Sequence, residues 1–268
     1  MRLHIFGLGY TATALAALLP PLSISTRTTP FQETAQALRS ASHLLISAPL
    51  GGDGDPCLNQ FAEVIAGATD LRWIGYCSTT GVYGDRHGGL VNETTPPSPG
   101  QERSKRRLAA EDAWRAIRSD LPLDLFRLAG IYGPGRSAFD DLRAGRARRI
   151  IAPGRKFGRI HRDDAARAIA AAILRPGPAG ARVLHLADDC PAASADVITY
   201  AAELLGVPPP PAITLDQALP LMSTMAQSFW AESRLIDNAA TKQALALTWL
   251  YPSYREGLKA ILTEETHQ

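Results

Sequence analysis

The sequence predicts an α/β fold, a doubly wound parallel sheet with a small C-terminal lobe. Short apolar runs alternate with helix-forming stretches through the first half of the chain, a pattern typical of parallel strands covered by helices on both faces. A glycine-rich turn between the first apolar run and the first helical stretch is a second indication. The 268 residues, 46% of them apolar, suffice for one large domain with a smaller lobe.

The elements are predicted from the spacing of apolar residues and from the residues that interrupt it. Strands are expected at 2–6, 22–26, 43–48, 71–78, 123–129 and 183–187. Helices are expected at 11–19, where Pro20 and Pro21 end the pattern, and at 32–40, 58–66, 103–118, 163–174 and 195–205. Between them, residues 139–147 form a basic helix, and 149–152 and 159–160 form short strands. A helix-rich tail ends in a helix after Tyr254.

Composition excludes several classes of protein. The net charge of +2 favours neither a nucleic-acid binder nor a membrane-surface protein, and no apolar run of about 18 residues could span a membrane. The first residues, MRLHIF, are interpreted as a buried strand and not as a secretory signal. Cys57, Cys77 and Cys190 lack metal-binding spacing. We therefore expect a cytoplasmic protein with reduced, buried thiols and no metal.

The glycine-rich turn predicts a Rossmann-type domain that binds a dinucleotide. In the segment FGLGYTA, Gly7 permits a tight turn, Gly9 lets the backbone approach a pyrophosphate, and Ala12 allows close packing of helix on strand. Tyr10 and Thr11 open the helix, whose first amides and partial positive charge face the phosphates. A purely structural turn is the alternative. We predict the dinucleotide-binding domain at 1–135, completed by about 158–188, and the substrate lobe at 136–157 and 189–268.

The end of the second strand predicts which dinucleotide is bound. An acidic residue there would favour NAD, but the sequence has Thr26 and Arg27. Arg27 could pair with a 2′-phosphate and Thr26 could hydrogen-bond to it. NADP is therefore preferred. NAD is the alternative, since an arginine here could also stack on adenine or be a solvated loop residue.

Four segments resemble motifs of the extended short-chain dehydrogenase/reductases, the branch that holds the nucleotide-sugar epimerases and dehydratases. In order along the chain they are YCSTTGVYGD (76–85), FRLAGIYGPG (126–135), RIHRDD (159–164) and LHLADD (184–189). The resemblance covers nearly the whole chain. It implies a nicotinamide dinucleotide cofactor and further cofactor contacts at Ala48, Pro49, Leu50, Ser78, Ala129 and Gly130.

The resemblance also implies where catalysis would take place. The family uses a Ser or Thr, a Tyr and a Lys four residues after the Tyr. Thr79 matches the Ser/Thr and Lys105 matches the Lys, which also holds the cofactor ribose, but Gln101 stands where the Tyr is expected. None of the seven tyrosines has a lysine four residues later. An amide cannot serve as an acid or base near neutral pH, so the chain resembles atypical members of the superfamily.

Three hypotheses follow from Gln101. In the first, the protein is an oxidoreductase with another proton donor, for which Tyr83, Tyr132 and His161 are candidates. The first two match family positions that are not the acid, and His161 could instead cap the helix that begins near Asp163. In the second, the protein is an NADP-binding sensor or scaffold without turnover. In the third, the substrate or water carries the proton in hydride transfer.

The basic region at residues 136–162 predicts how substrate is bound. Nine Arg and Lys residues lie between 136 and 162, and they could bind an anionic small molecule, although most are expected to be solvated. Arg136 and Arg159 flank the motifs of the cleft and are the preferred substrate contacts. Trp230 could close over the substrate, with burial in the small lobe as the favoured alternative. No aromatic interleaving supports RNA binding. The substrate is expected to be small or nucleotide-linked, and the protein a monomer or homodimer.

Overall fold

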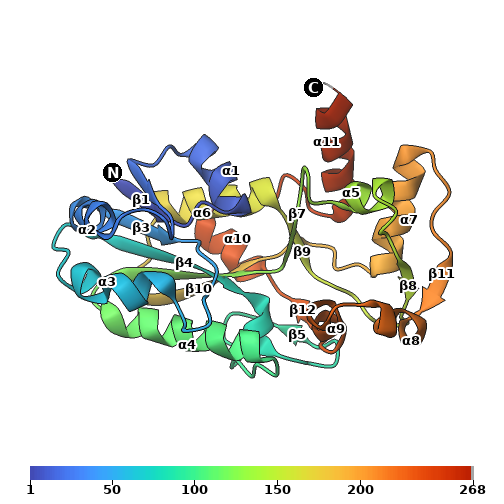
Figure 1. Cartoon of the computed structure of the whole chain (residues 1–268), viewed down its shortest axis with the longest axis horizontal. Helices are drawn as coiled ribbons and strands as arrows, with labels where there is room; N and C mark the ends of the chain where they lie inside the picture. Colours follow the sequence, from blue (N-terminus) through green and yellow to red (C-terminus); the bar gives the residue numbers. More distant parts are fainter. Residues whose placement is uncertain (267–268) are drawn as a thin grey trace.

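A six-stranded parallel sheet forms the centre of the molecule in the computed structural model, which describes residues 1–266 (Figure 1). The strand order is β10-β6-β4-β3-β1-β2. The bounds are β1 Leu3–Phe6, β2 Ser23–Ser25, β3 His43–Ile46, β4 Trp73–Thr79, β6 Pro122–Leu128 and β10 Gly180–Leu186. All six predicted strands are therefore present, and the predicted α/β fold class is confirmed.

Helices cover both faces of this sheet. On one face lie α1 (Tyr10–Leu18), α6 (Arg162–Leu174) and α10 (Ala239–Leu245), and on the other lie α2 (Phe31–Ser40), α3 (Pro56–Ala66) and α4 (Glu102–Ile117) (Figure 1). Successive strand residues point to opposite faces: Ile5 packs in the core under α1 and α6, and Phe6 packs in the core under α2 and α3. Two separate apolar cores thus hold one sheet, as a doubly wound fold requires.

The strand order reverses at β1. The chain passes from β1 outward to β2 and then returns to β3 on the other side of β1. At such a switch point, the loops that follow the two neighbouring strands diverge. Their divergence creates the usual ligand crevice at the carboxyl ends of a parallel sheet. The loops after β1, β3, β4, β6 and β10 all lie at this edge, because every pair in the sheet is parallel.

A smaller lobe adjoins the same edge. Its core is formed by α5 (Ala138–Arg143), α7 (Ser194–Leu205) and α11 (Tyr254–Thr266), which bury Phe139, Val197, Tyr254 and Leu258 together. Two short helices, α8 (Leu215–Ala218) and α9 (Thr224–Trp230), and a 3-10 turn, η2 (Leu219–Leu221), precede the return to the sheet (Figure 1).

Three pairs of short parallel strands join segments far apart in the sequence. β5 (Leu90–Val91) pairs with β12 (Leu235–Ile236), β7 (Gly130–Tyr132) with β9 (Arg159–His161), and β8 (Arg149–Ile151) with β11 (Ala212–Thr214). The sequence predicted β8 and β9 but not their partners. After β12 the chain returns to the sheet, where Leu245 and Trp249 join the core under α6. The predicted division into two domains stays a prediction.

Candidate functional site

The glycine turn lies where the sheet order reverses. Gly7 has φ +95°, and a Cβ there would lie 2.5 Å from the backbone nitrogen of Ala48, so the contact between the loops after β1 and β3 requires glycine. Gly9 is different: its φ is −90°, and a Cβ would meet nothing closer than Ser47 Oγ at 3.9 Å. Contacts within residues 1–266 therefore do not explain why position 9 is a glycine. Close approach of a bound ligand to the backbone would explain it.

The first turn of α1 is open to an anion. Gly9 is its N-cap and supplies no side-chain cap, so the amides of Tyr10, Thr11 and Ala12 remain available to a phosphate at the positive end of the helix. The Tyr10 hydroxyl donates to the Pro134 carbonyl at 2.8 Å. The guanidinium groups of Arg136 and Arg162 lie 5.7 and 5.2 Å from the Tyr10 ring centre. Two cations therefore stand beside the turn, which fits a pyrophosphate.

The residues predicted to select the cofactor lie at the end of β2. The Arg27 guanidinium donates to the Pro49 carbonyl at 2.8 Å, which joins the loops after β2 and β3. The Thr26 hydroxyl contacts that of Thr28 at 2.9 Å. Both residues are exposed, and Leu50 next to Pro49 is half-buried. Arg27, Thr26, Pro49 and the glycine turn thus occupy neighbouring loops on one edge of the sheet.

The predicted catalytic residues meet at the start of α4. Thr79 Oγ1 accepts a hydrogen bond from the Gly81 amide at 3.1 Å, and a Cβ on Gly81 would lie between Thr79 Oγ1 and Ser104 Oγ. Gln101 is the N-cap residue of α4, without a side-chain cap bond, and its carbonyl accepts from the Lys105 amide. The Lys105 ammonium is 57% exposed and lies 4.0 Å from Glu102. The structure therefore brings Thr79 to the turn that carries Gln101 and Lys105.

The hydroxyl of Ser78 does not face this turn. Ser78 is buried and donates to Glu111 Oε1 at 2.5 Å. Ala129 and Gly130, in contrast, follow β6 directly, and Gly130 lies open at the carboxyl edge. A cofactor contact by Ser78 would have to come from its main chain.

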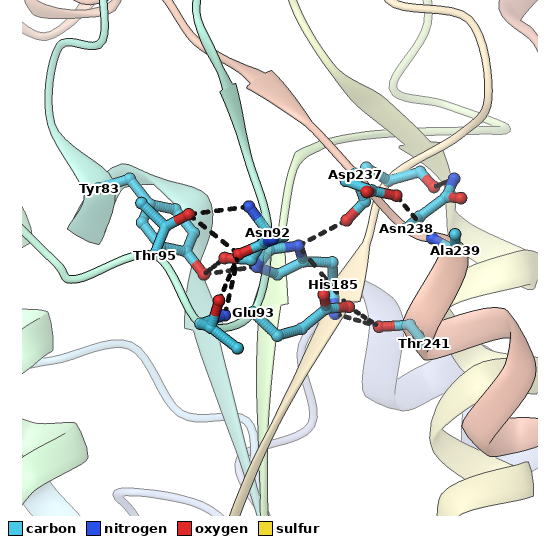
Figure 2. A network of polar contacts seen from close by, with 11 residues as sticks. Tyr83, Asn92, Glu93, Thr95, His185, Asp237, Asn238, Ala239 and Thr241 are labelled. Carbon is cyan, nitrogen blue, oxygen red and sulfur yellow. Dashed lines mark hydrogen bonds and ion pairs between the residues drawn. The ribbon is translucent and has the colours of Figure 1, made fainter.

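Tyr83 lies inside a buried polar network (Figure 2). Its hydroxyl is 2.5 Å from His185 Nε2 and 3.1 Å from the Asn92 carbonyl. His185 Nδ1 donates to the Asp237 carbonyl at 2.7 Å, and the Thr241 hydroxyl joins the His185 amide to Glu93. Burial lowers the pKa of His185, so the neutral ring accepts from Tyr83. Burial also raises the pKa of Tyr83. This network joins β10 to the segment after β12, and Tyr83 lines neither of the two cavities described below.

Tyr132 and His161 are also engaged in packing. The Tyr132 hydroxyl donates to the Ser253 carbonyl, and burial raises the pKa of this phenol strongly. His161 Nδ1 accepts from the Asp163 amide at 3.3 Å, so the prediction that His161 caps this helix is confirmed. Burial lowers the pKa of His161, and its Nε2 has no partner within residues 1–266. Neither ring lines the first cavity described below, but Tyr132 lines the second.

A cavity of about 240 Å³ opens at the carboxyl edge beside the ends of β4 and β6. Its wall combines aromatic residues with charged and hydroxyl groups: Thr80, Gly130, Lys156, Phe157, Gly158, Arg159, Ser194, Phe229, Trp230, Glu232, Arg234 and Ile236. Of the predicted residues it contains Gly130, Arg159 and Trp230. Trp230 is half-buried and packs edge-to-face on Phe157 at 5.0 Å, so it both lines the cavity and packs within the small lobe, and its role as a lid stays a prediction. Trp230 ends a helix that covers the cavity.

Arg136 lies in a second cavity. This one, of about 300 Å³, is bounded by α5 and α11 and contains Arg136, Arg146 and Tyr254. Arg159 borders both cavities. Its guanidinium is held by the carbonyls of Phe157 and Ala192 at 2.9 and 3.0 Å. The two predicted substrate arginines thus both line the second cavity, and Arg159 also lines the first.

Most lining residues of the first cavity were not among the predicted site residues, including Lys156, Phe157, Glu232 and Arg234. Glu232 and Arg234 stand in the segment FWAESR, from which only Trp230 was selected. An acidic residue two positions after an apolar helix end gives little signal by itself. The pairing of β12 with β5 and the contacts of Ser233 and Arg234 with residues 84–86 hold this segment in place.

The three cysteines differ in exposure. Cys57 is buried and Cys77 half-buried, but Cys190 is exposed. The expectation of a buried thiol is therefore wrong for Cys190, because it lies in the loop after β10 at the open edge of the sheet. Within residues 1–266 no cluster of three His, Cys, Asp or Glu side chains could hold a metal ion. In that same range, no helix has the length and apolar character needed to cross a membrane.

Comparison with known proteins identifies close structural relatives. A conserved protein of unknown function from Silicibacter pomeroyi is 41% identical, with a TM-score of 0.86 over 98% of this chain and 99% of that one. The chain belongs to the same family as this protein. No family model matches the sequence. The human epimerase family protein SDR39U1, solved with NADPH, has a TM-score of 0.78 at 17% identity over 98% of this chain and 99% of its own, which shows a shared fold.

Two curated proteins match part of the chain. Protein YeeZ of Escherichia coli is 33% identical over 183 residues, which are 65% of this chain and 63% of YeeZ. A 3-diazoavenalumate denitrifying reductase from Streptomyces is 31% identical over 170 residues, or 60% of this chain and 54% of the reductase. The match thus spans less than two thirds of either protein. The fold of this family is that of the epimerase/dehydratase branch of the short-chain dehydrogenase/reductases.

Proposed function

We propose that this protein is an NAD(P)-dependent oxidoreductase acting on a small carbonyl or hydroxyl substrate. The observation that carries the proposal is Gly9. No contact within residues 1–266 requires glycine there, yet the position faces the open first turn of α1 beside Arg136 and Arg162. A dinucleotide whose pyrophosphate approaches the backbone accounts for that space.

The surrounding residues fit this cofactor. The first-turn amides of α1 would hold its phosphates, and Arg27 with Thr26 would hold a 2′-phosphate, so we propose NADP as the preferred form and NAD as the alternative. A bound nicotinamide would supply hydride exchange with the substrate carbon. The human neighbour was solved with NADPH, and one sequence relative is named a reductase. Both support redox chemistry.

The cavity supports a small substrate over a nucleotide-linked one. Its volume of about 240 Å³ lies below the range of roughly 300–1,000 Å³ common for drug-sized ligands. Phe157, Phe229 and Trp230 offer apolar walls, and the exposed Lys156 adds a cation to the lining. We propose a substrate with a planar apolar body and an anionic group, acted on by a cytoplasmic monomer or homodimer.

Gly9→Ala tests cofactor binding at the turn. The structure accommodates a methyl group here, so the variant is expected to fold with unchanged stability. The methyl group would hold the pyrophosphate off the backbone and weaken NADPH binding at least about tenfold. Gly67→Ala, at the end of α3 where a Cβ meets only ordinary contacts, is the control. Calorimetric titration with NADPH gives both affinities, and equal affinities would contradict the proposal.

Turnover distinguishes the enzyme from a second candidate, a sensor that binds NADPH without chemistry. Gln101 favours the sensor, because an amide at the predicted acid position cannot transfer a proton. Para-formylbenzoate carries an aldehyde, an aromatic body and a carboxylate. Steady loss of NADPH absorbance with this compound or related aldehydes supports the oxidoreductase. Tight NADPH binding with no turnover across such a panel supports the sensor.

A further inference from the structure

We infer that Glu232 receives and returns the substrate proton in this protein, in place of a tyrosine; the inference rests on the proposed function. Glu232 lines the 240 Å³ cavity and is only 7% exposed. Its Oε1 has no hydrogen-bond partner within residues 1–266. Because an unpaired buried acceptor is costly, this oxygen is suited to a donor that arrives with the ligand.

The other oxygen of Glu232 is fixed. Arg234 Nη1 donates to Glu232 Oε2 at 2.8 Å and to the Gly84 carbonyl at 2.7 Å. The intervening residue is anchored as well, since the Ser233 amide donates to Asp85 at 2.8 Å and its carbonyl accepts from the Arg86 amide at 2.9 Å. The carboxylate is therefore held in one orientation, with Oε2 occupied and Oε1 free.

Glu232 lies beside the predicted position of the missing tyrosine. A Cβ on Gly100 would come within 3.3 Å of Glu232 Oε1, and Gly100 directly precedes Gln101. The cavity also contains Thr80, next to Thr79, and Gly130, at the end of β6. A carboxylate from the segment after α9 thus reaches the turn from which the family's phenol would act.

The proposed step removes one proton and one hydride from an alcohol substrate. For an alcohol substrate, the O–H bond breaks and the proton passes to Glu232 Oε1. The C=O bond forms as the hydride leaves the same carbon for the oxidised nicotinamide. In the reduction of a carbonyl, the protonated carboxyl returns the proton to the oxygen. Lys156, Arg159 and Arg234, the other charged groups of the cavity, carry no proton acceptor for this step.

The Glu232→Gln variant distinguishes the roles of the two carboxylate oxygens. Arg234 can only donate, so the amide oxygen takes the place of Oε2 and the amide NH₂ takes the place of Oε1. The variant keeps the shape and the contact with Arg234 but replaces the acceptor at Oε1 with a donor. Glu203→Gln, on the exposed side of α7, makes the same chemical change outside the cavity.

Binding to the cofactor-free protein gives a readout independent of turnover. Para-(hydroxymethyl)benzoate can donate to Oε1, and para-(methoxymethyl)benzoate cannot. We expect wild type and Glu203→Gln to bind the alcohol about tenfold more tightly than the ether, since the ether leaves Oε1 unpaired. Glu232→Gln should lose this preference. Calorimetry measures both affinities, and an unchanged preference in Glu232→Gln would overturn the inference.

Gly100→Ala provides a second route if Glu232→Gln fails to fold. The added methyl group requires the carboxylate to move by a few tenths of an ångström and leaves its charge and its pairing with Arg234 in place. The preference for the alcohol should shrink, while Gly67→Ala keeps it. In turnover, Glu232→Gln should lower kcat by about 10²–10⁴ with NADPH affinity unchanged. Loss of NADPH binding in Gly9→Ala is a separate result, so failure of the cofactor assignment would be distinguishable from failure here.

Discussion

At the scale of single residues, the site depends on side chains held by main-chain carbonyls. Arg27 donates to Pro49, Arg155 to Trp230, and Arg159 to Phe157 and Ala192. The bonds to Pro49, Trp230 and Ala192 join segments far apart in the sequence, and each uses only part of a guanidinium with five N–H donors. The remaining donors stay available to an anionic ligand in a fixed orientation.

Arg27→Glu should change the preference for the cofactor. The charge-assisted contacts with a 2′-phosphate are lost and a carboxylate replaces them, so NADPH affinity should fall by about 10–100-fold. NADH affinity should stay unchanged or rise, because a carboxylate accepts from the ribose hydroxyls. Fluorescence titration with both cofactors measures the ratio. Arg39→Glu, an exposed change of the same charge in α2, is the control, and an unaltered ratio in Arg27→Glu would refute this role.

The residues that sequence could and could not reveal differ in where their partners lie. Gly7, Gly9 and Arg27 follow strands directly, so their location at the sheet edge could be inferred from local order alone. Glu232 reaches the same edge through contacts between segments far apart in the sequence, such as the pairing of Leu235 with Leu90. A two-residue strand has no periodicity to detect. The position of Glu232 at the sheet edge could therefore not be predicted from the sequence.

At the scale of elements, α4 is fastened to the sheet by a buried ion pair. Glu111 on α4 accepts from Arg127 on β6 at 3.1 and 2.7 Å, from Ser78 on β4 at 2.5 Å and from Arg115 at 3.2 Å. Glu111 and Arg127 are both essentially inaccessible. Because α4 begins at Gln101 and carries Lys105, this pair also sets the position of the predicted catalytic turn.

Glu111→Gln should therefore destabilise the protein. Removing the negative charge leaves Arg127 buried without a counter-ion, and loss of one partner of such a pair costs about 3–5 kcal/mol of unfolding free energy. Asp112→Asn, one residue further along α4, removes an exposed partner of Arg115 and should cost less than about 1 kcal/mol. Urea denaturation compares the two variants. A loss below about 1 kcal/mol in Glu111→Gln would show that the pair contributes little.

The long elements could be predicted from the sequence, but the side-chain contacts that attach them to one another could not. The strands β4 and β6 and the helix α4 follow from runs and spacings of apolar residues. The Glu111–Arg127 pair does not, because a charged residue in an amphipathic helix is ordinarily expected on the solvated face. Only the packing of α4 across two strands shows that Glu111 faces inward.

At the scale of the whole molecule, Asp188 lies where the sheet meets the small lobe. It follows β10, its amide donates to the Arg159 carbonyl, and Asp189 beside it donates to Pro252. Asp188 is 2% exposed, and neither carboxyl oxygen has a well-formed hydrogen bond within residues 1–266. Burial raises the pKa of Asp188 to about 8, only partly offset by the nearby Arg159 guanidinium and Cys190 amide.

This raised pKa predicts how stability depends on pH. An unfolded Asp has a pKa of about 3.9, so between that pH and about 8 the folded state binds the extra proton. The stabilisation from Asp188 is therefore full below about pH 4 and is lost as pH rises towards 8, by up to about 1.4 kcal/mol per pH unit. His4 has the opposite sign, because burial lowers its pKa to about 4, and its contribution is lost as pH falls from about 6.5 to 4.

Asp188→Asn isolates the acidic group. The amide has the same shape and does not titrate, so the variant should lose the decline in stability that Asp188 gives the wild type between pH 6.5 and 8. His4 contributes equally to both proteins, so the difference between their slopes reports Asp188 alone. Urea midpoints measured across this interval give the two slopes. Parallel slopes would mean that Asp188 is ionised in the folded protein, and that the junction between sheet and lobe holds a carboxylate paired with Arg159.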